Sequence, residues 1–143
     1  MSSDGDIIQP EGNSDIVLVE LNNDGSQSFV KNLGGPTFDS GEDLIPTKQG
    51  NILVLGTTHS KAIEVSSNVV SETNENSATI LYELFPFNRK IKTYILDGSG
   101  IENPYALDQK QNGTVVVVGS TTSADGLFPV SYGETDIFIA FWD

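Results

Sequence analysis

Apolar residues fall in short blocks along the chain, and polar turn residues separate these blocks. The blocks are rich in Val, Ile, Leu, Phe and Thr, and Gly, Asn, Asp, Ser or Pro residues bound them. This pattern is typical of β-strands in an all-β protein. It predicts strands near residues 15–21, 27–33, 42–47, 51–57, 78–84, 90–96, 104–109, 114–119 and 136–142.

Turn residues between the blocks predict hairpins. Asn23-Asp24-Gly25, Gln49-Gly50-Asn51 and Gln111-Asn112-Gly113 carry the residues that tight turns prefer. No segment shows a sustained helical period. The segment 61–72 is the best helical candidate, but it is β-branched and Ser-rich, which favours an extended loop or an extra hairpin.

Two apolar runs do not alternate with polar residues. They are Ile52-Leu53-Val54-Leu55 and Val115-Val116-Val117-Val118. A continuous apolar run predicts a strand that is covered on both faces. Such strands occur where sheets stack face to face, as in β-propellers.

The chain matches itself at an offset of 63 residues. Residues 15–60 and 78–123 share 11 identities over 46 ungapped pairs, and most of them lie at strand ends and turns. The segment 136–142 is a third copy of the first strand. A unit of about four strands that recurs every 40–60 residues indicates propeller blades. We therefore expect one repeat domain over residues 13–143, preceded by a loosely docked tail at 1–12.

The order of the motifs resembles the SBBP-type bacterial β-propeller repeat. The first copy reads Leu33-Gly34-Gly35, then Gly41 to Ile45, then Gln49 to Thr58. The second copy adds Phe128-Pro129-Val130 and the strand start at Asp136. The first copy departs from the family pattern, since its segment 61–77 lacks the Phe-Pro element.

The resemblance implies blades of four antiparallel strands, here two repeats plus one extra strand. Two blades cannot close a ring, because an apolar face of each would stay in water. Burying one such face of about 500 Å² contributes on the order of 10 kcal/mol. We therefore expect a homo-oligomer, with a trimer of six blades as the simplest ring, or a ring completed by further chain. The extra strand could pair across a chain junction.

Charge and composition exclude several classes of function. The 143 residues carry a net charge of −13, which opposes binding to nucleic acid or to an anionic membrane surface. The absence of cysteine removes disulfides, thiolate zinc sites and cysteine nucleophiles. We expect no membrane insertion, because no apolar stretch is long enough to span a bilayer. The first residues do not resemble a secretory signal, and the compartment stays open, although the resemblance favours a cell-surface, extracellular or virion setting.

Two groups of residues are candidates for binding. Exposed aromatic rings near loops stack on sugars, which makes Phe128, Tyr132 and Trp142 candidates for a glycan site. A cluster of carboxylates can hold a hard cation such as calcium, and the candidates are Asp39, Glu42 and Asp43. The second copy offers only Glu102 at that place, so no repeated metal site is expected, and no other cofactor is implied.

The sequence favours a non-catalytic structural or binding module that self-associates. Surface adhesion, the binding of a glycan or protein ligand, and virion decoration all fit such a module. The alternative is a propeller-type hydrolase that uses carboxylates lining the ring channel. Against it, the copies share no acid near the strand starts, apart from Glu20 and Glu83 within strands. His59, the only histidine, has Thr122 as its repeat partner, so no catalytic residue is assigned.

Overall fold

A computed structural model describes residues 12–66, 69–73 and 76–143, and this part of the chain is all-β without a helix. Each of the nine predicted strands is present, and the segment 61–72 forms the extra hairpin. The strands are β1 (Ile16–Leu21), β2 (Gln27–Leu33), β3 (Asp39–Pro46), β4 (Ile52–Thr58), β5 (Ala62–Ser66), β6 (Val69–Glu72), β7 (Ala78–Phe85), β8 (Lys90–Leu96), β9 (Glu102–Gln109), β10 (Val115–Thr121) and β11 (Asp136–Trp142).

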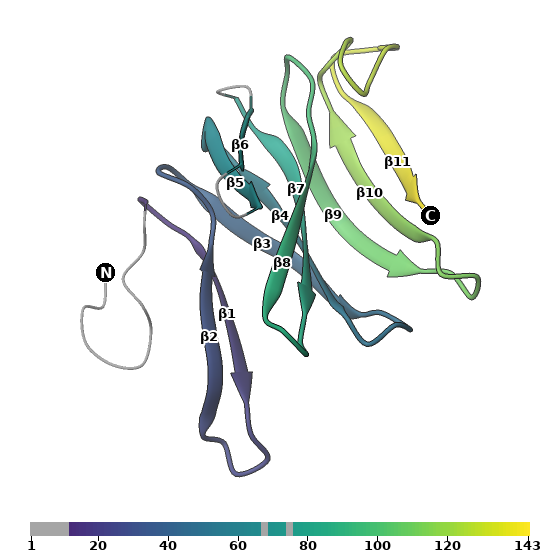
Figure 1. The fold of residues 1–143 in the computed structure, drawn as a ribbon. Coiled ribbons are helices and arrows are strands. Elements are labelled where there is room, and N and C mark those ends of the chain that lie inside the picture. The colour runs from purple at the N-terminus through teal and green to yellow at the C-terminus, as the bar shows by residue number, and fades with distance from the viewer. Residues whose placement is uncertain (1–11, 67–68, 74–75) are drawn as a thin grey trace.

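Three antiparallel sheets follow one another along the chain (Figure 1). We call them the N-terminal sheet (β1–β2), the central sheet (β3–β4–β7–β8) and the C-terminal sheet (β9–β10–β11). The hairpin β5–β6 is a separate small sheet. The strands therefore divide as two, four and three, not as two complete sets of four with one left over. The extra strand β11 pairs with β10 of its own chain, at the place that β7 takes beside β4.

The sequence repeat is reproduced residue by residue in the backbone. Every β3–β4 pair, from Asp39 with Thr58 to Pro46 with Ile52, has a β9–β10 counterpart exactly one repeat later. Both pairs of strands skip one residue at the same point, Glu42 in β3 and Tyr105 in β9. The pairs β1–β2 and β7–β8 share a register from Ile16 with Leu33 to Glu20 with Phe29, and then differ, because β1–β2 has a shift at Leu21. The repeat therefore begins at the third strand of one sheet and ends at the second strand of the next.

Two apolar cores lie on opposite faces of the central sheet. Ile16, Leu18 and Leu33 of the N-terminal sheet pack with Val54 and other residues of the central sheet. On the other face, Leu53, Leu55 and Leu81 pack with residues of the C-terminal sheet, which include Leu107, Val117 and Phe138. Burial of these side chains is the main force that joins the three sheets.

The two continuous apolar runs differ in how they are covered. The run in β4 is covered on both faces, as predicted, because the central sheet lies between two others. Within one chain the run in β10 is covered on one face. Only Val117 is fully buried there, because the C-terminal sheet has a neighbour on one face.

The three predicted glycine turns have the backbone geometry that glycine favours. Gly25, Gly50 and Gly113 have φ angles of 85°, 84° and 99°. The predicted tail at 1–12 lies outside the described residues except for Gly12, which already packs against the backbone near Pro36. Among the described residues there is no helix long and apolar enough to cross a membrane.

Candidate functional site

A buried carboxylate stands at the start of β3 and holds several loop groups. One oxygen of Asp39 accepts hydrogen bonds from the Gly35 N–H (2.9 Å) and from the Ser60 hydroxyl (3.1 Å). The Ser60 hydroxyl in turn accepts the Thr37 N–H (3.0 Å), and the Ser60 N–H donates to the Thr58 hydroxyl (3.0 Å). These bonds tie the loop before β3 to the chain leaving β4.

The same network recurs at the start of β9. Glu102 accepts hydrogen bonds from the Gly98 N–H (3.1 Å), from the Thr121 hydroxyl (2.9 Å) and from the Ser123 hydroxyl. The Ser123 hydroxyl accepts the Gly100 N–H (2.8 Å), and the Ser123 N–H donates to Thr121 (2.9 Å). We call these two arrangements the carboxylate networks.

The expectation that the copies share no acid near their strand starts is wrong. Asp39 and Glu102 are one repeat apart, and both side chains are buried. Ser14 and Ser77 are also one repeat apart, and their hydroxyls donate to the backbone carbonyl groups of Asp39 and Glu102, respectively. An identity count misses this relationship, because Asp and Glu are different residues although both carboxylates accept equivalent hydrogen bonds. Matching side chains by chemistry at the known offset would have found it.

One buried region on the N-terminal side of the central sheet contains polar groups without partners. The second oxygen of Asp39 and the hydroxyl of Tyr82 are buried there and make no hydrogen bond within the described residues. Burial raises the pKa of Tyr82 above its usual range, and the negative charges of Asp39 and Asp15 raise this pKa further. Tyr82 therefore stays neutral at any ordinary pH.

The three carboxylates considered for calcium have separate hydrogen-bond partners. Asp39 belongs to its network, and exposed Glu42 accepts the Ser40 hydroxyl (2.9 Å). Asp43 accepts the N–H of Leu44 (2.8 Å) and, across the sheets, the N–H of Leu107 (2.9 Å). The described residues contain no cluster of three or more acidic, His or Cys side chains that could hold a metal ion. Calcium binding gains no support from this arrangement.

The three aromatic candidates for glycan binding lie in different surroundings. Phe128 is buried against Phe138, with ring centroids 5.1 Å apart. Trp142 packs edge-to-face on Tyr94 with centroids 5.5 Å apart. Tyr132 is exposed, and its N–H donates to Asp136 (2.8 Å). The structure therefore does not bring the three rings together, and a sugar site here stays a prediction. A second feature with binding potential is the exposed apolar surface of the two outer sheets.

Both outer faces of the stack carry exposed apolar side chains. On the N-terminal sheet, Val17, Val19 and Leu21 are exposed, and on the C-terminal sheet Ile137, Ile139 and Phe141 are. At the corresponding positions in the central sheet, Ile80, Leu81 and Tyr82 among them, the side chains are buried by the neighbouring sheets. We call these exposed sets the N-terminal and the C-terminal outer face.

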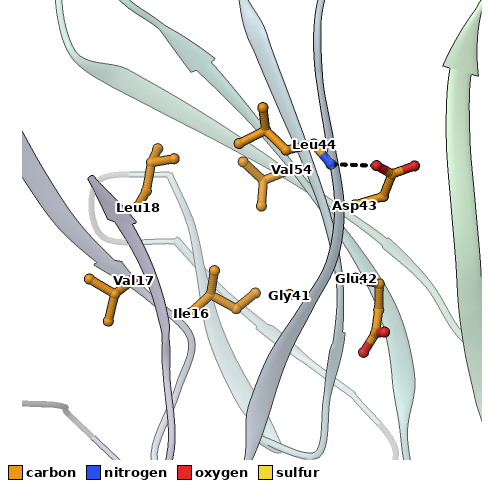
Figure 2. Close-up of a pocket in the computed structure, with 8 residues that line it drawn as sticks. All are labelled: Ile16, Val17, Leu18, Gly41, Glu42, Asp43, Leu44 and Val54. Carbon is orange, nitrogen blue, oxygen red and sulfur yellow. Dashed lines mark hydrogen bonds between the residues drawn. The ribbon is translucent and has the colours of Figure 1, made fainter. Parts of the chain in front are cut away.

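An open groove of about 380 Å³ lies between β1 and the central sheet (Figure 2). Its lining is mainly apolar and comes from Ile16, Val17 and Leu18 on one side and from Gly41, Glu42, Asp43, Leu44 and Val54 on the other. In the described structure β1 pairs only with β2, so the edge of β1 toward this groove has no partner strand. A site of this kind suits an extended β-strand.

Comparison with known proteins gives no relative. No family model, no curated protein and no solved structure matches this chain.

Proposed function

We propose that this protein is a non-catalytic module of stacked β-propeller blades that self-associates through its two outer faces. The three sheets correspond in this proposal to part of a blade, a whole blade and part of another. The resemblance to SBBP-type repeats supports it, as does the repeat-related packing of each sheet on the next.

A single comparison carries the proposal. Leu44 and Leu107 hold the same position in the repeat, but Leu107 is 5% exposed and Leu44 is 47% exposed. Leu107 lies on the face of the C-terminal sheet that packs on the central sheet. Leu44 lies on the equivalent face of the central sheet, at the place where the N-terminal sheet has no strands to cover it. A side chain that the repeat buries in one copy and leaves in water in the other indicates a missing neighbour.

The two outer faces are complementary, because each is equivalent by the repeat to one side of the contact between the central and the C-terminal sheet. The C-terminal outer face is equivalent to the face of the central sheet that packs on the C-terminal sheet. The N-terminal outer face is equivalent to the face of the C-terminal sheet that packs on the central sheet. One chain can therefore follow another head to tail, and a ring of three chains gives six blades when the two partial sheets at each junction form one blade.

The carboxylate networks support a structural role rather than hydrolysis. Their acids are buried and engaged by loop donors, whereas a hydrolytic acid must reach a substrate. Adhesion, glycan or protein binding and virion decoration are uses that such an assembly could serve, and of the glycan candidates Tyr132 has the ring that a sugar could reach.

Light scattering coupled to size-exclusion chromatography tests the proposal. We expect a mass that is a multiple of the 15.4 kDa of one chain, with three chains favoured. A folded, monodisperse species with the mass of one chain at high protein concentration would contradict self-association. Turnover in a glycosidase and esterase panel that is lost on neutralising channel acids would contradict the non-catalytic assignment.

A further inference from the structure

We propose that the groove beside β1 is a docking site for strand β10 of a second copy of this chain, which releases its own β11 and takes the neighbour's β1 instead. This inference rests on the proposed self-association and specifies how two chains join. It is a strand exchange, since an element of the partner replaces an equivalent element of the same chain.

The free edge of β1 is the first reason. The chain has three copies of this strand, namely β1, β7 and β11. The edge of β7 is occupied by β4, and the edge of β11 is occupied by β10 in the same register. Only β1 lacks that partner among the described strands. The repeat therefore specifies which kind of strand fits there and in which alignment.

The groove wall is the second reason. A β10 strand placed on β1 in the register of β4 on β7 sets Val118 opposite Leu18 and Val117 opposite Val19. Val116 and Val118, which are half-exposed in their own sheet, then point toward Leu44 and Val54 of the second chain. Val117 keeps its buried position against its own central sheet.

The number of strands is the third reason. Two strands of the C-terminal sheet, β9 and β10, and the neighbour's β1 and β2 together make one four-stranded sheet like the central one. β11 is then the one strand of the three main sheets with no place in a stack of complete sheets. The segments 15–21 and 136–142, which contain β1 and β11, both begin with Asp-Ile, so β10 gives up one partner for a closely similar one.

A second copy fits the groove better than an unrelated extended peptide. The occupant must fill the groove with one face and cover the apolar surface of a central sheet with the other. Strand β10 carries valine at four successive positions and so presents apolar side chains to both sides. It also brings β9, whose bulge and pairing reproduce those of β3.

Disulfide trapping tests this register, because the chain has no cysteine of its own. We expect the double variant Val19→Cys, Val117→Cys to form disulfide-linked dimers and trimers on mild oxidation, since directly opposed residues have Cβ atoms about 5 Å apart. Within one chain these residues lie in sheets on opposite sides of the central sheet, so an internal disulfide cannot form.

The matched control is Leu18→Cys, Val117→Cys. In the proposed register Leu18 is next to the opposed residue but projects from the other face of the strand, so we expect at least about tenfold less linked product. An assembled protein without Val19–Val117 linkage, or with equal linkage in the control, overturns the strand exchange and leaves self-association standing. A monomer overturns both.

Removal of β11 gives an independent test. In the exchange, a chain that ends at residue 133 remains folded and assembles at a lower concentration than the full chain, because β10 no longer has to release β11. If the truncated chain folds but stays monomeric, the proposal is wrong. If it fails to fold, the cysteine pair in the full chain decides.

Discussion

Gly56 of β4 and Gly119 of β10 lie one repeat apart, and each sits directly against the carbonyl oxygen of the neighbouring strand. A Cβ atom at Gly56 would approach the Ser40 oxygen to 2.4 Å and the end of the Ile16 side chain to 2.7 Å. At Gly119 it would approach the Asn103 oxygen and the Phe138 ring to 2.5 Å each. The repeat thus preserves a close approach of backbone at the centre of two sheets.

Alanine at either glycine is expected to destabilise the protein. Because backbone cannot move away as a side chain can, we expect Gly56→Ala and Gly119→Ala to lower the free energy of unfolding by about 1–3 kcal/mol. Urea unfolding followed by circular dichroism measures this. Gly133→Ala is the control, since nothing lies within 4 Å of its added Cβ. An unchanged midpoint in both variants would contradict the tight packing.

The carboxylate networks are expected to contribute similarly to stability in both copies. Asp39→Ala and Glu102→Ala each leave buried N–H and hydroxyl donors without an acceptor, which costs about 2–3 kcal/mol. Thermal unfolding gives the comparison. The control is Glu42→Ala, which removes an exposed acid from the same strand as Asp39 and should have little effect. A large loss in the control as well would indicate a general charge effect.

Tyr82 is expected to make the fold sensitive to alkali. Its pKa is raised in the folded state by burial and by Asp39 and Asp15, so the folded chain keeps this proton while the unfolded chain releases it above about pH 10. The folded state binds more protons there, so stability is complete below that pH and falls as pH rises, by up to about 1.4 kcal/mol per pH unit.

The variant Tyr82→Phe removes that contribution. Its unfolding free energy should decline less between pH 9 and pH 11 than that of the parent chain, by roughly 1 kcal/mol at the upper end. At neutral pH we expect little change, because the lost hydroxyl has no partner in the described structure. Tyr94, whose pKa is also raised by burial and by its bond to Glu83, contributes to the remaining slope. Parallel pH curves would contradict this account.

A charge on the N-terminal outer face is expected to prevent assembly without unfolding the chain. Val19 is 41% exposed, so lysine there is tolerated in one chain but is costly when buried against another. Val19→Lys should shift the light-scattering mass to that of a single chain. Phe87→Lys, at an exposed apolar residue in the β7–β8 turn, should leave the mass unchanged.

Association should strengthen as salt is added. Each chain carries a net charge of −13, and salt screens the repulsion between chains while it leaves apolar contacts intact. Sedimentation at low and high sodium chloride concentrations would show more assembled material at high salt. The opposite trend would indicate that ion pairs, rather than apolar faces, hold the chains together.

The strands and turns were predictable because their causes are local. β-branched blocks and the glycines at positions 25, 50 and 113 specify strands and tight turns within a few residues. The division into sheets was not predictable in this way. It depends on whether β2 pairs with β3 or packs beside it, and the repeat in the sequence is the same in both cases.

The carboxylate networks show why the candidate site was harder to predict. Proximity in sequence groups Asp39 with Glu42 and Asp43, yet the hydrogen-bond partners of its carboxylate are Gly35 and Ser60. Buried polar networks join loops that are distant along the chain, so proximity in sequence selected the wrong companions. Leu44 is exposed because the two-stranded N-terminal sheet does not reach over it. The identity of the residue does not reveal this, because Leu107 is buried at the same position of the repeat.

The third copy of one strand, where the other strands of the main sheets occur twice, also bears on the timing of assembly. While β11 covers the edge of β10, a newly made molecule can exist alone without exposing that edge. The slow step of assembly is then the release of β11, which occurs within a single chain. Higher protein concentration would raise the final amount of assembled product but would hardly shorten the wait for it.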